Sequence, residues 1–171
     1  MRHATALVLP MRVELRWPLI ATPQSAARAL VLDTNIVLDL LVFGDPATAA
    51  LGPLLQSGTL RWVATAPMRD ELERVLGYPK IAPRVAFYGL TTAAVLQAFD
   101  AQAQRVDVAP RVAVTCRDAD DQKFLDLAAA QCAVLLSKDK AVVAQRKRLL
   151  AHGAHVGSVL VLAPPQAMAL A

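Results

Sequence analysis

The chain has 171 residues, 56% of them hydrophobic, and its 18 Lys and Arg residues exceed its 14 Asp and Glu residues, for a formal charge of +4. This length supports one domain with a substantial core, and the positive charge suits a polyanionic partner. Two cysteines without a CxxC spacing, Cys116 and Cys132, argue against a disulfide scaffold or a structural zinc site and fit a reducing cytoplasm.

The first 28 residues precede the first predicted strand. Residues 4–9 are apolar, as in an export signal, but charged residues between positions 12 and 16 interrupt the run before an apolar core develops. We expect residues 1–28 to be a poorly ordered extension, or translation to begin at Met11. No later stretch approaches the length of a membrane span.

Residues 29–32 form a short apolar run, typical of a strand that is buried on both faces of a parallel sheet. In such sheets the ligand site lies beyond the carboxyl ends of the strands. Asp33, which follows the run, is therefore expected to point at a site. Asp39 lies in the next apolar segment, where we predict a partly exposed or locally hydrogen-bonded position, with an outer-shell role as the alternative.

Residues 60–65 predict a second strand and residues 66–76 a helix, with Pro67 in its first turn and Gly77 as its end. Glu71 lies on the apolar stripe of this helix and has no cation at helical spacing. An unpaired carboxylate that faces inward is costly unless something neutralises it, and a divalent cation does so. The alternative is a rim position that reaches water or a distant Arg.

The next acidic segment opens a helix. Asp121 precedes Phe124 and Leu125 at helical spacing and so begins the buried stripe. Asp118 and Asp120 are predicted to cap the helix, although spacing alone leaves Asp120 as a replacement for, or an assistant to, Asp121. Asp126 is predicted to be solvated on an outer face.

Residues 133–137 form another short apolar run, typical of a buried parallel strand. Asp139 lies just beyond the carboxyl end of this strand, so it too is expected to point at the site. Basic residues follow this strand and are expected to hold a nucleic-acid backbone. For the three at positions 146–148, the alternative is a solvated helix end. These candidate substrate-binding residues are Lys138, Lys140, Arg146, Lys147 and Arg148.

The remaining elements complete an alternating order of strands and helices. Residues 79–88 predict a broken helical connection that shapes the substrate entrance, residues 91–105 and 141–152 predict helices, and residues 156–162 predict a last strand. This alternation predicts an α/β fold with a mainly parallel sheet and right-handed crossovers. Residues 166–171 are predicted to be a tail, either docked or disordered.

We hypothesise that the four acids Asp33, Glu71, Asp121 and Asp139 converge in space. Hard divalent cations prefer oxygen ligands, and carboxylates gathered without a metal repel one another. A bound ion activates water and stabilises a leaving oxygen. We expect Asp33 and Asp121 to bind it most directly, and the number of ions stays open.

Four fragments in this order, residues 31–35, 70–72, 118–128 and 135–140, resemble a PIN domain. The resemblance is closest to the toxin components of bacterial toxin-antitoxin pairs, related to VapC toxins, and covers residues 29–165. It implies a three-layer α/β/α sandwich and a ribonuclease that depends on Mg²⁺ or Mn²⁺. The four family acids fall on Asp33, Glu71, Asp121 and Asp139, with Asn35 and Ser137 as supporting polar residues.

The resemblance also implies an RNA substrate, a cognate antitoxin, and a homodimer or higher oligomer. The chain departs from the family in its long N-terminal segment and in its surplus of acids around Asp121. Two alternatives stay open. One is a housekeeping nuclease that processes RNA or other nucleic acid, and the other is a non-catalytic α/β module that binds a cation or nucleic acid.

Overall fold

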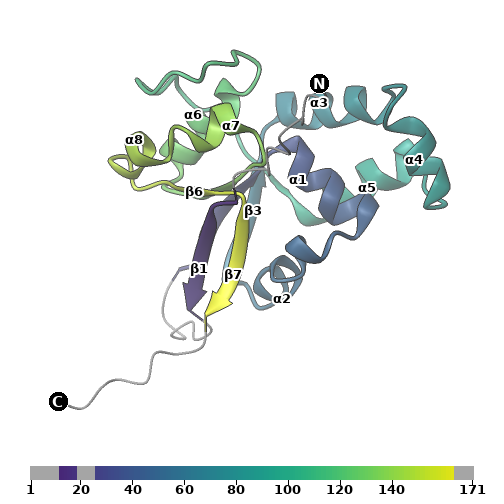
Figure 1. Ribbon diagram of the computed structural model, residues 1–171, viewed down its shortest axis with the longest axis horizontal. Helices are drawn as coiled ribbons and strands as arrows, with labels where there is room; N and C mark the ends of the chain where they lie inside the picture. The colour runs from purple at the N-terminus through teal and green to yellow at the C-terminus, as the bar shows by residue number, and fades with distance from the viewer. Residues whose placement is uncertain (1–11, 19–25, 164–171) are drawn as a thin grey trace, which may run out of the picture.

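A computed structural model describes residues 12–18 and 26–163. Its central sheet has five strands in the order β4-β3-β2-β5-β6, and all neighbouring strands are parallel. Helices cover both faces of this sheet (Figure 1), as the alternation of strands and helices predicted. The strands of the described residues are β1 (Glu14–Pro18), β2 (Arg28–Leu32), β3 (Leu60–Ala64), β4 (Gln104–Arg105), β5 (Val134–Leu136), β6 (His155–Gly157) and β7 (Val159–Ala163).

The core lies around the two central strands. Leu30 and Val31 of β2, and Leu135 of β5, are fully buried. Because helices cover both faces, these strands have no solvent side and their sequences are continuously apolar rather than alternating. Leu32 of β2 is level with Leu136 of β5, so the residues that follow these two strands emerge at the same edge of the sheet.

The helices differ from the predicted ones mainly in their bounds. The helix predicted at 141–152 is two helices, α7 and α8, and the one predicted at 91–105 ends at Gln102 and is followed by β4. The predicted broken connection contains α4. The helical segments of the described residues are α1 (Thr34–Leu38), η1 (Asp39–Phe43), η2 (Pro46–Thr48), α2 (Leu51–Gln56), α3 (Ala66–Leu76), α4 (Ala82–Phe87), α5 (Thr92–Gln102), α6 (Gln122–Ala130), α7 (Lys140–Val143) and α8 (Arg146–Leu150).

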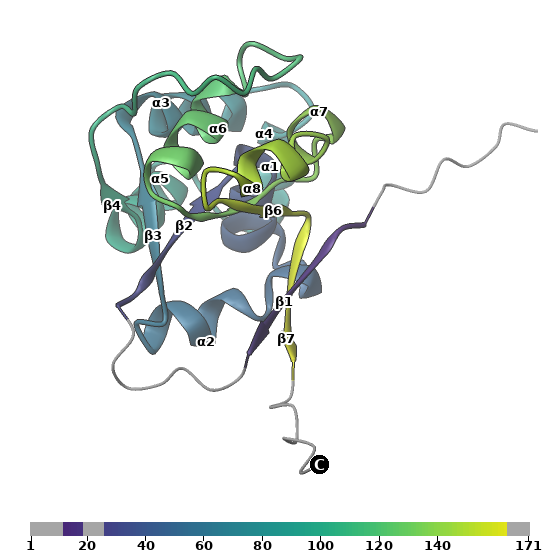
Figure 2. The same ribbon diagram turned by 90° about the vertical axis from the view of Figure 1, so that its left-hand side faces the viewer.

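A second, two-stranded sheet pairs β1 with β7 in parallel, and this ribbon extends away from the central sheet (Figures 1 and 2). The single strand predicted at 156–162 is therefore two strands, β6 and β7, which separate at Ser158. The expectation of a poorly ordered extension is wrong for residues 12–18 and 26–28, and the rest of that extension and the predicted tail at 166–171 lie outside the described residues.

Local contacts explain why β1 joins the fold. The Ser158 hydroxyl accepts a hydrogen bond from the backbone N–H of Val13 (2.8 Å), and the Val13 carbonyl accepts one from the backbone N–H of Ser158 (2.8 Å). Leu15 and Trp17 then pack against the hydrophobic core. This contact could not be predicted from the sequence, because the pattern of a single amphipathic strand does not indicate which strand it pairs with.

None of the described helices is by itself long and apolar enough to cross a membrane. The bent pair Thr34–Phe43 and Pro46–Gln56, with 106° between its halves, meets that test only when its two parts are taken together.

Candidate active site

The candidate site lies at the carboxyl edge of the central sheet. Asp33 follows β2 directly, and its backbone N–H donates to the carbonyl of Leu136 at the end of β5 (3.0 Å). Ser137 is the next residue of that strand, and Asp139 comes two residues later. The ends of two parallel strands therefore bring residues 33 and 139 to one edge, as the sequence predicted.

Asp33 is only 4% exposed, and its carboxylate is held by two side chains. Its Oδ2 accepts hydrogen bonds from the buried Ser137 hydroxyl and from Asn35 Nδ2 (3.1 Å). Asn35 Oδ1 in turn accepts from the backbone N–H of Lys138 (3.2 Å). Both residues expected to support the site thus contact Asp33, and Asn35 also ties the start of α1 to the loop after β5.

Glu71 reaches the site from α3. Its Oε1 accepts a hydrogen bond from the Thr34 hydroxyl (2.5 Å), and its Oε2 forms an ion pair with the Lys123 ammonium. The side chains of Glu71 and Lys123 are 13% and 21% exposed. The helical pattern correctly gave Glu71 no cation on its own helix, but the fold supplies one from α6, so the prediction of an unpaired carboxylate is wrong.

Lys123 is the site residue that the sequence did not reveal. Its ammonium also donates to the backbone carbonyl of Asp120 and lies 4.7 Å from the centroid of the Phe124 ring. A lysine near the start of an amphipathic helix has the same sequence signature as a solvated lysine. Only the ion pair with Glu71 of α3 distinguishes the two.

Asp121 stands immediately before α6, and its carboxylate makes no capping hydrogen bond there. Burial, followed by the negative charges of Asp33, Asp139, Asp118 and Glu71, raises its pKa from 3.8 to about 7. Asp118 Oδ1 instead accepts from the backbone N–H of Asp120 (2.9 Å), so Asp118 stabilises the turn before the helix. Asp120 is exposed.

The pKa of Asp33 is also raised, first by burial and then by the charges of Glu71 and Asp139, while the hydrogen bond from Ser137 opposes the change. Burial is the larger cause of both shifts, and the contributions from the other acids show that these carboxylates lie within electrostatic reach of Asp33 and Asp121. The structure therefore brings the four acids, Asp33, Glu71, Asp121 and Asp139, into one region from four separate segments of the chain.

The donor set fits a hard divalent cation in its chemistry, because it offers carboxylate oxygens and carries excess negative charge that a cation would neutralise. Two carboxylates are, however, engaged elsewhere. Glu71 contacts Thr34 and Lys123, and Asp139 Oδ1 accepts from the backbone N–H of Ala141 (2.6 Å), capping α7. As they stand, no three Asp, Glu, His or Cys side chains of the described residues are grouped closely enough to hold an ion.

Two other acids differ from expectation. Asp39 is 5% exposed and its Oδ2 pairs with Lys138 Nζ (2.6 Å), so the prediction of partial exposure or a local hydrogen bond is wrong. Asp126 accepts hydrogen bonds from the backbone N–H of Val112 (3.0 Å) and from Gln122 Nε2 (2.8 Å), so it is not simply solvated. Lys138 and Val112 lie in loops that helical periodicity cannot place, whereas Gln122 lies on the same helix as Asp126, four residues earlier.

The basic candidates separate into two groups. Lys138 contacts Asp39, and Lys140 is exposed in the first turn of α7, next to Asp139. The other three lie on α8, where Arg146 and Lys147 border a hollow of about 200 Å³ beside Val13 of the ribbon. Arg146 and Lys147 thus lie beside the ribbon.

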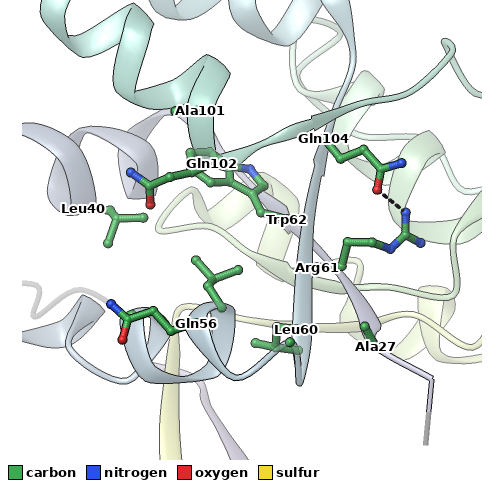
Figure 3. A pocket seen from close by; sticks show the side chains of 12 residues that line it. Ala27, Leu40, Gln56, Leu60, Arg61, Trp62, Ala101, Gln102 and Gln104 are labelled. Carbon is green, nitrogen blue, oxygen red and sulfur yellow. Dashed lines mark hydrogen bonds between the residues drawn. The ribbon is translucent and has the colours of Figure 1, made fainter.

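A separate hollow of about 700 Å³ lies between α2, β3 and α5 (Figure 3). Leu40, Leu55 and Trp62 give it an apolar lining, and its rim carries Gln56, Gln102 and an Arg61 whose Nη1 donates to Gln104 Oε1 (2.8 Å). No acid lines it. It is distinct from the four carboxylates.

A family profile described as the PIN domain matches residues 29–141. The match spans more than half of the chain and contains all four acids, and the chain belongs to the PIN domain family. PIN domains are generally nucleases.

A comparison with solved structures supports the fold. The crystal structure of VapBC2 from Rickettsia felis, bound to a DNA fragment from their promoter, is similar with a TM-score of 0.50 and 14% sequence identity, over 80% of this chain and 98% of the other. At this identity the similarity concerns the fold. No curated protein matches the chain.

Proposed function

We propose that this chain is a divalent-metal-dependent endoribonuclease and the toxin component of a type II toxin-antitoxin pair. The observation that supports the proposal is the surroundings of Asp121, whose pKa is raised to about 7 by burial and then by the negative charges of Asp33, Asp139, Asp118 and Glu71. A nuclease that binds Mg²⁺ or Mn²⁺ uses such a group of carboxylates, because the cation neutralises their charge.

In this proposal Asp33 and Asp121 hold the cation most directly, and Glu71 and Asp139 complete the site. A bound Mg²⁺ or Mn²⁺ would supply an activated water and polarise the phosphoryl oxygen. The chain's own residues keep the donors in place: Ser137 and Asn35 fix the carboxylate of Asp33, and Thr34 orients that of Glu71. Hydrolysis adds the elements of water across one P–O bond of the RNA backbone.

The charge balance supports a polyanionic substrate. If four of the 14 acids line one site, the rest of the surface is more basic than the formal charge of +4 indicates. Lys138 and Lys140 flank Asp139, and in this proposal they contact RNA phosphates, although Lys138 also pairs with Asp39. Arg146, Lys147 and Arg148 on α8 would extend that contact only for a substrate that reaches the ribbon.

The toxin assignment includes an antitoxin partner in a reducing cytoplasm. This assignment rests on the resemblance of the sequence to VapC-related toxin components. In addition, the apolar hollow around Leu40, Leu55 and Trp62 is a surface that a partner's side chains could fill (Figure 3). The alternative is housekeeping RNA processing. A small adjacent gene whose product binds this chain and suppresses its toxicity would favour the toxin, and its absence would favour the alternative.

The deciding experiment is cleavage of a defined RNA with and without Mg²⁺ or Mn²⁺. We expect metal-dependent cleavage that falls by at least about a hundredfold in Asp33→Asn and Glu71→Gln, since each change removes a charged donor from the site. Glu73→Gln is the matched control, because Glu73 lies on the same helix, is exposed and, among the residues that the structure describes, pairs only with Arg69. Full activity in chelator, or in both site variants, would exclude the proposal.

A further inference from the structure

The ribbon leaves one edge of β1 without a strand partner among residues 12–18 and 26–163, because its sheet contains β1 and β7 alone. The Val13 carbonyl accepts from Ser158 and Val159 of the other strand, so the backbone of Val13 faces β7. Backbone direction alternates along a strand, so Leu15 and Trp17 face β7 too. Glu14 and Arg16 therefore present their N–H and C=O groups to the outer edge.

This edge calls for a partner on physical grounds. An unpaired strand edge is a template for another strand. Parallel sheets are rarely left uncovered, and a two-stranded ribbon is only marginally stable in water. A third strand on β1 would satisfy the outward backbone groups of Glu14 and Arg16.

We propose that the partner is β1 of a second copy of this chain, paired antiparallel about a two-fold axis at Leu15. In that register Glu14 lies opposite the partner's Arg16, and Arg16 lies opposite the partner's Glu14. Opposite charges directly across a strand pair stabilise it. The outward backbone groups of each such pair then exchange two hydrogen bonds.

The charges select this register. An axis at Glu14 places two glutamates opposite each other, and an axis at Arg16 does the same with two arginines, which is destabilising. A two-fold axis that passes between two residues would place outward-facing backbone groups of one strand opposite inward-facing groups of the other, so the two strands would form no backbone hydrogen bonds. Among two-fold axes that pass through a residue of β1, only the one at Leu15 combines hydrogen bonding with opposite charges; an axis at Val13, just before β1, would pair Glu14 with the partner's Arg12. The register at Leu15 builds one four-stranded sheet in the order β7-β1-β1-β7.

This contact would involve exposed residues outside the part of the chain that matches the family profile. β1 lies outside residues 29–141, which match the PIN domain profile. Glu14 and Arg16 are both exposed, and the only ion pair of Glu14 in the described residues is with its neighbour Arg12. The dimer is independent of the proposed nuclease activity.

The test is the association state of the full chain, measured by sedimentation at several micromolar concentrations. We expect the parent to be a dimer, and Glu14→Arg or Arg16→Glu to weaken dimerisation by about tenfold or more, because each creates two like-charge pairs across the axis. The double swap Glu14→Arg with Arg16→Glu restores the charge pairs and should restore the dimer. Arg12→Ala controls for the neighbouring ion pair.

Cross-linking locates the contact. On the two-fold axis, Leu15 lies directly opposite the Leu15 of the second copy, as a non-hydrogen-bonded pair with close α-carbons. Leu15→Cys in a Cys132→Ser background should therefore form an intermolecular disulfide under mild oxidation. Glu14→Cys in the same background should not, because residue 14 faces residue 16. A monomeric parent, single charge reversals without effect, a double swap that does not restore the dimer, or equal cross-linking at both positions would each overturn the proposal.

Discussion

The hydroxyl of Ser137 donates a hydrogen bond to Asp33 and accepts one from the backbone N–H of Asp139 (2.9 Å). One buried side chain thus connects two of the four acids, which belong to segments more than a hundred residues apart. The geometry of the acids depends on this small residue as much as on the carboxylates themselves.

Ser137→Ala should therefore destabilise the protein. The variant leaves the buried Asp33 carboxylate without its hydroxyl donor, and we expect the free energy of unfolding to fall by about 2 kcal/mol, as measured by urea denaturation. The pKa of Asp33 should rise further, because the hydrogen bond that opposes burial is lost. Ser57→Ala, at an exposed serine, is the control, and equal stability of the two variants would contradict this account.

Lys123→Met should bind Mn²⁺ several-fold more tightly than the parent in titration calorimetry. The lysine ammonium already neutralises Glu71, so a metal ion must compete with it. The same variant should lose roughly 2 kcal/mol of stability without metal, because a partly buried carboxylate is left unpaired. Lys80→Met removes an exposed lysine from the connection between α3 and α4 and should change neither quantity. Unchanged or weaker Mn²⁺ binding in Lys123→Met would show that the lysine does not compete.

The pKa of Asp121 predicts how the stability of the metal-free protein depends on pH. In the unfolded chain this carboxyl has its ordinary pKa of 3.8, and in the fold about 7. Between these values the folded state keeps a proton that the unfolded state has lost, so stability falls as pH rises through this window. Asp121→Asn should flatten this part of the profile, measured as melting temperature against pH. A parent and variant with parallel profiles would refute the assignment.

Proton competition at Asp121 also affects the metal. We expect the apparent affinity for Mn²⁺ to rise with pH up to about 7 and then to level off, because the carboxyl must lose its proton to bind the ion. Calorimetry in buffers of different ionisation enthalpy would detect the released proton. Binding without proton release at pH 6 would place Asp121 outside the metal site.

Gly157→Ala should detach β1. An added Cβ would lie 2.6 Å from Leu15 Cγ and 2.9 Å from the Val13 carbonyl oxygen, and the backbone atom cannot move without shifting the strand. We expect a loss of about 1–3 kcal/mol and faster proteolysis after Arg16. Gly52→Ala, on α2 with no atom within 4 Å of its added Cβ, should be neutral or slightly stabilising. Comparable proteolysis of the two variants would contradict the contact.

The sequence predicted those features that follow from local pattern. The acids after β2 and β5 could be placed because a buried parallel strand has a continuous apolar signature and a fixed functional end. The bounds of α3, Ala66–Leu76, followed from Pro67 and Gly77. The apolar stripe of α6 favoured Asp121, which stands directly before this helix, but spacing alone left Asp120 as an alternative.

The remaining features depend on contacts between segments distant in sequence. Lys123 of α6 pairs with Glu71 of α3, and half-buried Asp126 accepts a hydrogen bond from the backbone N–H of Val112 in the preceding loop. The pairing of β1 with β7 could not be predicted either, since the sequence of a short amphipathic strand does not specify its pairing partner.

Gly157 links the ribbon to the carboxylates. Its α-carbon lies against Leu15, and its carbonyl accepts from the backbone N–H of Ser137 (3.0 Å). A molecule that displaces β1 would therefore disturb Gly157 and, through it, Ser137 after β5, which donates a hydrogen bond to Asp33. A ligand that binds the ribbon would thus act on the four acids from a distance, without contacting them.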